Sequence, residues 1–281
     1  MVTPLFKEEG KAYVYHYTSL ATSLEKILSS GKIQFGPLGK TNDPRESKYW
    51  HMGGLLSSLI DKRNDKMEKI INNYRLNYCK ILCLTIDEEK HRSAEFDNFW
   101  LKGFEHPRMW AQYAENHRGI CMVFELDKLI QAVKASFKDS HIFHGKVNYS
   151  DSPFAVFEAT SKVRDIAGED DLLAEEFICG HYETLFLMKN YDWKSENEYR
   201  FIIVGKDINY EYLPIGNSLS GIILGCDFPM CYLPVVDKYR IEYNLKVGQM
   251  SWYHGSPGIS EIQEPQMRKV ISDWLREQSK K

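Results

Sequence analysis

The sequence predicts an α+β protein with mixed and antiparallel sheets flanked by helices. Short runs of β-branched and aromatic residues alternate along the chain with segments whose apolar residues recur at helical spacing. The length of 281 residues suits one large domain, and no linker, internal repeat or low-complexity segment divides it. We therefore expect a single domain over residues 1–281, with a core at about 12–226 and C-terminal strands and a helix over 227–281.

Composition argues against several classes of function. The formal net charge is −3 and the pI is about 6.3, so bulk charge gives no attraction to nucleic acid or to acidic membranes. The chain has neither an apolar run of membrane-spanning length nor a basic-then-apolar N-terminal pattern, so we expect a cytoplasmic protein with no membrane partner. Six cysteines without a Cys-x-x-Cys pair are typical of buried thiols in a reducing compartment.

The chain opens with a predicted strand over residues 12–18, a helix over 20–30 and a strand over 32–35. Ser19 is the expected N-cap of the helix, and Gly31 is expected to end it. His16 and Thr18 share one face of the first strand, because side chains alternate between faces. A lone histidine on a strand is usually structural. A His-x-Thr pair near the end of a strand can instead bind a ligand, because it presents hydrogen-bond donors and acceptors at a fixed spacing.

The next polar motif is Thr41-Asn42-Asp43-Pro44-Arg45-Glu46. Asn-Asp-Pro is a turn signal, and proline suits the first position of a helix. The motif is open to two interpretations. It is either a capped helix start, or a loop whose helix N-terminus and Arg45 hold a diphosphate.

The middle of the chain alternates between predicted helices and strands. Trp110 and Tyr113 are three residues apart and share a helix face. Core packing is the favoured role for Trp110, whereas Tyr113 could also stack on a flat ligand ring. The predicted elements are a mainly helical region at 47–78, a strand at 79–86, a long loop at 87–107, a helix at 108–114, a strand at 120–125, a helix at 127–137, a strand at 142–149 and a helical region at 153–190 broken near Gly168.

The run that opens with Glu196-Asn197-Glu198 and continues to Val204 is predicted to be a buried strand. Alternation along a strand directs Glu196 and Glu198 to the same face. A carboxylate pair at a strand entrance allows one group to act while the other positions it or accepts a proton. The plainer alternative is a solvated strand end in which Glu198 pairs with Arg200. Beyond this run we expect short strands or turns at 209–213 and 219–225, with a central strand at 221–225. A short helix or turn is expected at 229–240, an extended segment at 241–254 and a helix at 265–277.

The order of these motifs resembles that of the ADP-ribosyltransferase superfamily, whose members share a His, then an aromatic residue or Ser, then a Glu. Tyr15-His16-Tyr17-Thr18-Ser19 resembles its first-strand motif, and Glu196-Asn197-Glu198 resembles the Glu-x-Glu of its late strand. More closely, the chain resembles a bacterial family of unknown function, DUF2971, from about residue 13 to 225. That likeness rests on Tyr15-His16-Tyr17, Asn42-Asp43-Pro44-Arg45-Glu46, Met109-Trp110-Ala111-Gln112-Tyr113 and Glu196-Asn197-Glu198-Tyr199-Arg200.

The resemblance implies a split-sheet core, NAD as substrate and no metal. Glu198 would stabilise the oxocarbenium-like cation that forms as the nicotinamide bond breaks, and Glu196 would position or deprotonate the acceptor. His16, also expected to be catalytic, would orient NAD. Tyr113 or Tyr17 would stack on nicotinamide. The implied cofactor-binding set is His16, Tyr17, Thr18, Asn42, Arg45 and Tyr113.

The implied function is NAD-dependent ADP-ribosyl transfer to a macromolecule by a bacterial toxin or phage-defence effector. Nucleic acid is slightly favoured over protein as acceptor, and a neutralising antitoxin protein is a possible partner. Two alternatives stay open. One is a metal-dependent nuclease with Asp192 and Glu198 as metal ligands, and the other is a non-catalytic sensor that binds a nucleotide through His16 and Arg45. The basic residues that could line a groove for single-stranded nucleic acid are Lys102, Arg108, Arg118, Lys189 and Lys194.

Overall fold

The computed structural model describes residues 5–6, 8–51, 62–88, 102–152, 171–205 and 208–278. The chain forms two compact units that alternate along the sequence. Unit 1 comprises Met1–Ile33, Leu84–Val133 and Leu213–Lys281, and unit 2 comprises Gln34–Cys83 and Lys134–Tyr212. No single cut in the sequence separates them, because segments of unit 1 lie before, between and after those of unit 2. The organisation as one domain stays a prediction.

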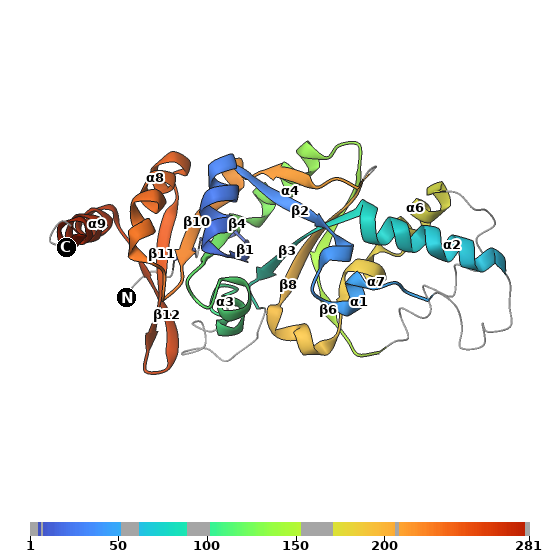
Figure 1. The fold of residues 1–281 in the computed structure, drawn as a ribbon, viewed down its shortest axis with the longest axis horizontal. Helices are drawn as coiled ribbons and strands as arrows, with labels where there is room; N and C mark the ends of the chain where they lie inside the picture. Colours follow the sequence, from blue (N-terminus) through green and yellow to red (C-terminus); the bar gives the residue numbers. More distant parts are fainter. Residues whose placement is uncertain are drawn as a thin grey trace. The chain divides into compact units, whose positions relative to one another are not determined.

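Unit 1 is built on strands that pair mainly antiparallel (Figure 1). Their order is β12, β11, β10, β4, β1 and the end of β3, and β10 and β11 form the parallel pair. The strands predicted at 12–18, 120–125 and 219–225 are confirmed, whereas β12 has no counterpart among the predicted strands. The bounds are β1 Tyr13–Thr18, β3 Cys79–Ile86, β4 Ile120–Glu125, β10 Leu219–Leu224, β11 Lys246–Tyr253 and β12 Ser256–Glu261.

Most helical segments of unit 1 have a counterpart among the predicted helices, whereas the short segment at 216–218 has none. At the first of them, the Thr22 N–H donates to Ser19 Oγ at 3.2 Å, as expected for a cap. Gly31 ends that segment with a φ of 65°, a conformation that favours glycine. α8 continues to Tyr243, so the extended segment expected from residue 241 begins only with β11. The segments are η1 Thr22–Leu28, α3 Pro107–Tyr113, α4 Leu126–Ser136 (whose last residues belong to unit 2), η8 Gly216–Ser218, η9 Met230–Tyr232, α8 Leu233–Tyr243 and α9 Glu264–Gln278.

Strands β5 and β8 pair antiparallel in unit 2, and β8 also pairs with β3. β2 pairs antiparallel with the first part of β3, while the short strands β6 and β7 pair parallel to each other. Strands and helices therefore mix in both units, with antiparallel pairing prevailing, which agrees with the predicted α+β class; the split-sheet core stays an expectation. The remaining bounds are β2 Lys32–Pro37, β5 His141–Lys146, β6 Asn148–Tyr149, β7 Met188–Lys189, β8 Glu198–Val204 and β9 Glu211–Pro214.

The helices of unit 2 cover an apolar core that includes Met67, Ile71, Phe177, Phe186 and Ile202. The helical region predicted at 153–190 is confirmed for α6 and α7 but is wrong at 188–189, which form β7. The parts of the predictions over 52–61, 89–101 and 153–170 lie outside the described residues. The segments are η2 Leu38–Lys40, α1 Pro44–Ser47, α2 Lys62–Asn73, η4 Tyr74–Tyr78, α6 Asp171–Gly180, α7 Tyr182–Phe186 and η7 Tyr191–Glu196. No helix in the described part of the chain has the length and apolarity that a membrane crossing requires.

Candidate functional site: a buried carboxylate–cation cluster

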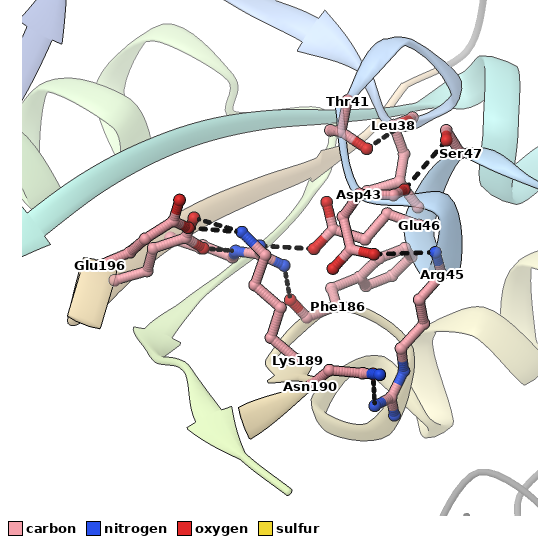
Figure 2. A network of polar contacts seen from close by, with 12 residues as sticks. Leu38, Thr41, Asp43, Arg45, Glu46, Ser47, Phe186, Lys189, Asn190 and Glu196 are labelled. Carbon is pink, nitrogen blue, oxygen red and sulfur yellow. Dashed lines mark hydrogen bonds and ion pairs between the residues drawn. The ribbon is translucent and has the colours of Figure 1, made fainter. Parts of the chain in front are cut away.

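The Asn-Asp-Pro turn forms a capped helix start in unit 2. The Arg45 N–H donates to Asp43 Oδ1 at 2.9 Å, and Pro44 occupies the first turn of α1. Glu46 is buried, whereas Arg45 is half-buried and its Nη1 donates to Asn190 Oδ1 at 3.2 Å (Figure 2). The cap interpretation is confirmed, and the diphosphate role of Arg45 stays a prediction.

Strand β8 begins at Glu198, so the expectation that Glu196 lies on this strand is wrong. Glu196 ends the 3-10 segment η7, and Asn197 between them has a left-handed backbone with a φ of 43°. Asparagine tolerates this conformation better than most residues do. Because Asn197 interrupts the extended backbone, strand alternation cannot be what directs the two carboxyl groups.

The two carboxyl groups nevertheless converge, on Lys189 at the end of β7. Lys189 Nζ donates to Glu196 Oε2 at 2.6 Å and to Glu198 Oε1 at 2.9 Å (Figure 2). Arg200 Nε donates to Glu198 Oε2, and Arg200 Nη2 lies 2.5 Å from Glu46 Oε1. The exposed fractions are 3% for Glu46, 2% for Lys189, 0% for Glu196, 6% for Glu198 and 0% for Arg200. We call these five residues the charged cluster.

Electrostatics distinguishes Glu196 from Glu198 within the charged cluster. Burial tends to raise the pKa of Glu198, but the neighbouring Arg200 and Lys189 charges outweigh burial and lower the pKa to about 2. Burial raises the pKa of Glu196, which the Lys189 charge offsets only in part. For Lys189, burial is outweighed by Glu198 and Glu46, which raise its pKa. At neutral pH, Glu198 is therefore an ionised carboxylate held inside the protein by two cations.

Further contacts fix the orientation of the charged cluster. The Glu198 N–H donates to the Tyr149 hydroxyl at 2.8 Å, which ties the start of β8 to β6. Lys189 Nζ lies 4.5 Å from the centre of the Trp193 ring. Arg200 Nη1 donates to the Phe186 carbonyl at 2.7 Å. Glu198 is therefore not the solvated strand end of the plainer alternative, although its pairing with Arg200 is real.

Part of this chain can be compared with known families, and that part runs from α3 to β8. Residues 109–201 match a family described as "Protein of unknown function (DUF2971)". This stretch is similar to DUF2971. It includes Lys189, Glu196, Glu198 and Arg200 of the charged cluster, and Glu46 lies outside it. No curated protein and no solved structure matches the chain.

The DUF2971 stretch also includes Tyr113, which belongs to unit 1 together with His16, Tyr17 and Thr18. Tyr113 is partly exposed, and its hydroxyl accepts a hydrogen bond from Gln112 Nε2 at 3.1 Å. His16 and Thr18 share one face of β1, and Tyr17 points to the other face. There Tyr17 is buried. Its ring packs edge-to-face against Trp110 with 5.1 Å between the ring centres, and its hydroxyl donates a hydrogen bond to the Gly103 carbonyl at 2.7 Å.

The remaining predicted residues, Asn42, Arg45, Glu196 and Glu198, belong to unit 2. Asn42 is exposed and directly precedes the cap residue of α1. Glu196 and Glu198 are the pair that the structure brings together. The sequence did not indicate that Lys189 contacts both glutamates, or that Glu46 contacts Arg200. A signal for Lys189 was present, because it directly follows the apolar run Leu185–Met188, and a lysine buried in such surroundings needs a carboxylate partner.

The described residues contain no group of three or more His, Cys, Asp or Glu side chains arranged to hold a metal ion. The nuclease alternative used Asp192 and Glu198 as ligands. Both oxygens of Glu198 already receive hydrogen bonds from cations. The nuclease alternative stays a prediction.

Unit 1 contains another perturbed carboxyl group, Glu105, in the turn before α3. Glu105 is 6% exposed, and its Oε2 accepts the Lys102 N–H at 3.1 Å. Burial, with a smaller contribution from the nearby Asp87 charge, raises the pKa of Glu105 to about 7. This group therefore titrates close to physiological pH.

We expect Glu105 to make unit 1 less stable as the pH rises from about 4.5 to about 7. The folded state holds this proton to higher pH than the unfolded chain does. The stabilisation is therefore complete below the pKa of Glu105 in the unfolded chain and is lost above its pKa in the folded protein. The free energy of unfolding should fall by about 2–3 kcal/mol. Urea unfolding of wild type and Glu105→Gln at about pH 5 and about pH 8 measures it, with the exposed Glu242→Gln as control. An equal pH dependence in wild type and Glu105→Gln would contradict the prediction.

Proposed function

We propose that the chain is an NAD-dependent ADP-ribosyltransferase in which Glu198 is the catalytic carboxylate. Breaking the nicotinamide–ribose bond develops positive charge on the ribose, and a carboxylate that is already ionised and oriented stabilises that charge without reorganisation. The observation that carries the proposal is the buried, ionised Glu198 held by Lys189 and Arg200 at the entrance of β8. The order of the His, aromatic and Glu motifs in the sequence supports it.

Glu198 keeps capacity to accept a hydrogen bond from a ribose hydroxyl, because a carboxylate has about four lone-pair positions. Glu196 has no exposed surface, so we assign it to supporting Glu198 rather than to deprotonating an acceptor. Tyr113 is a better candidate than Tyr17 for stacking on nicotinamide, because Tyr17 is fixed in the apolar core of unit 1. The resemblance of the motifs also assigns NAD binding to His16, Thr18, Asn42 and Arg45.

The acceptor in this proposal is a macromolecule, with nucleic acid slightly favoured over protein. The wider proposal is a cytoplasmic bacterial toxin or phage-defence effector, with a neutralising antitoxin protein as partner. These assignments follow from the resemblance of the motifs to ADP-ribosyltransferases.

The test is release of nicotinamide from labelled NAD in EDTA, with and without cell extract. We expect wild type to release nicotinamide and Glu198→Gln to release it about 100- to 1,000-fold more slowly, because the variant removes the charge that the transition state needs. Glu176→Gln makes the same chemical change at an exposed position of α6 and should match wild type. The position of the label after the reaction identifies nucleic acid, protein or water as acceptor.

Thermal unfolding of each variant shows whether a loss of release reflects loss of the fold. A wild-type protein that neither releases nicotinamide under any of these conditions nor binds NAD in calorimetry would refute the proposal. Equal rates for Glu198→Gln and wild type would refute the role of Glu198.

One observation favours a second candidate, a non-catalytic nucleotide sensor. Arg45 Nη2 is a buried atom without a hydrogen-bond partner in the described part of the chain, and a phosphate oxygen would satisfy it. A sensor would bind nucleotide without turnover in wild type. Arg45→Met would then abolish binding, whereas Glu198→Gln would leave it intact.

A further inference from the structure

Glu196 and Glu198 share one ammonium group. Lys189 Nζ lies 2.6 Å from Glu196 Oε2 and 2.9 Å from Glu198 Oε1, and all three side chains are buried. The second cation of the charged cluster, Arg200, is itself divided between Glu198 and Glu46. Two ionised carboxylates beside one ammonium would leave an excess negative charge in surroundings of low dielectric, which is costly.

A proton on one of the two carboxyl groups removes this excess charge, and the contacts indicate which one holds it. Glu198 lies against both Lys189 and Arg200, so its ionised form is the better compensated. Glu196 contacts Lys189, the ammonium group that it shares with Glu198. A protonated Glu196 can donate a hydrogen bond to an ionised neighbour, which an ionised Glu196 cannot do.

The groups around the pair add one further cation, Arg75, whose contacts are with Glu46 rather than with the pair. Cys83 on β3 and Tyr149 on β6 both lie within electrostatic range of Glu198, and burial raises the pKa of each, so both are neutral at neutral pH. On α1, Asp43 and Arg45 have opposite charges. Glu46 interacts with Arg200 and also lies near Arg75, whose Nη1 donates to the Glu46 carbonyl at 2.7 Å.

We propose that Lys189 is the positioning residue of this site: it holds Glu198 as the ionised carboxylate and leaves Glu196 as the protonated partner that donates a hydrogen bond to it. Glu196 and Glu198 then titrate as a coupled pair that carries one negative charge at neutral pH. The role of this arrangement in catalysis rests on the proposed function. The protonation states of Glu196 and Glu198 do not depend on it. The Glu-x-Glu motif thus contains two chemically different groups.

The experiment is a carboxyl ¹³C NMR titration of protein labelled at glutamate, with the two signals assigned through Glu196→Gln and Glu198→Gln. It requires no NAD. In wild type, the Glu196 signal should titrate at higher pH than the Glu198 signal. Lys189→Met should move the Glu198 midpoint to higher pH, Lys189→Arg should largely restore it, and the exposed Lys194→Met should leave it unchanged.

Glu196→Gln provides a second test, because glutamine has nearly the shape of a protonated glutamic acid and can donate the same hydrogen bond. We expect this variant to fold and to keep the low titration midpoint of Glu198. Lys189→Met should lower release about 10- to 100-fold, and the acid limb of its pH–rate profile should move to higher pH. A merely structural role for Lys189 would not move that limb.

An unchanged Glu198 midpoint in Lys189→Met, or a Glu196 signal that titrates below that of Glu198, would overturn the proposal. If Lys189→Met does not fold, Lys189→Arg and Glu196→Gln decide: a Glu196→Gln variant as unstable as Glu198→Gln would show that Glu196 is ionised. If the titrations are as expected but wild type releases no nicotinamide, the proposed function is refuted and the proposal about Lys189 stands.

Discussion

Replacing Arg200 by methionine should lower the free energy of unfolding by about 3–5 kcal/mol. Arg200 has no exposed surface, and it contacts the carboxyl groups of Glu46 and Glu198 and the carbonyl of Phe186. Methionine fills a similar volume but supplies none of these hydrogen bonds. The main effect of the substitution is that the carboxylates of Glu46 and Glu198 stay buried without the cation that they share. This costs far more free energy than the loss of an exposed ion pair.

Urea unfolding at neutral pH measures this loss. Arg240→Met is the matched control, because the partly exposed Arg240 pairs with Asp237 at 2.7 Å on α8 and its removal should cost about 1 kcal/mol or less. Combining Arg200→Met with Glu198→Gln should recover part of the loss, because the second change removes one uncompensated charge. Equal losses for the two arginine variants would show that the charged cluster is not coupled through Arg200.

Trp110→Ala should destabilise the protein by about 3–5 kcal/mol through loss of packing in unit 1. The indole is 1% exposed and belongs to the apolar core that also contains Tyr15, Tyr17 and Phe104. Its Nε1 donates to the Phe104 carbonyl at 2.8 Å. Alanine leaves a cavity beside Tyr17 and removes the donor for a buried carbonyl group.

Two further variants separate these contributions in the same unfolding experiment. Trp110→Phe keeps a ring but removes the donor, so it should cost less than the alanine variant. Tyr253→Ala removes an aromatic side chain that is 65% exposed and should change stability by only about 0.5 kcal/mol. If Trp110→Ala were as mild as Tyr253→Ala, the α3–β1 packing would not contribute to the stability of unit 1.

Local signals predicted most of the fold. The strand over 79–86 has the predicted bounds because an apolar, β-branched run allows little else, and Ser19 and Gly31 mark a helix through contacts within a few residues. Prediction failed where pairing is non-local. β7 has only two residues and pairs with β6 about forty positions earlier, so nothing in the local pattern distinguishes it from the helix before it.

The candidate site shows the same division. The sequence identified Glu196, Glu198 and the capped turn at Asp43, all of which are short local motifs. It did not indicate that Lys189 pairs with Glu196 and Glu198 or that Arg200 pairs with Glu46, because periodicity does not tell which cation contacts which carboxylate. The expectation that the two carboxyl groups lie together is correct, but the reason given for it, strand alternation, is wrong because Asn197 has a left-handed backbone.

The alternation of the two units along the chain sets an order for protein synthesis. Every residue of unit 2 has been synthesised once Tyr212 is added, whereas β4 of unit 1 still lacks its neighbour β10 at that stage. Until residues 219–224 emerge from the ribosome, β4 has an unpaired and strongly apolar edge, which is a site for mispairing or for a chaperone. The nascent chain therefore has all the residues of the charged cluster available before it can complete the sheet of unit 1.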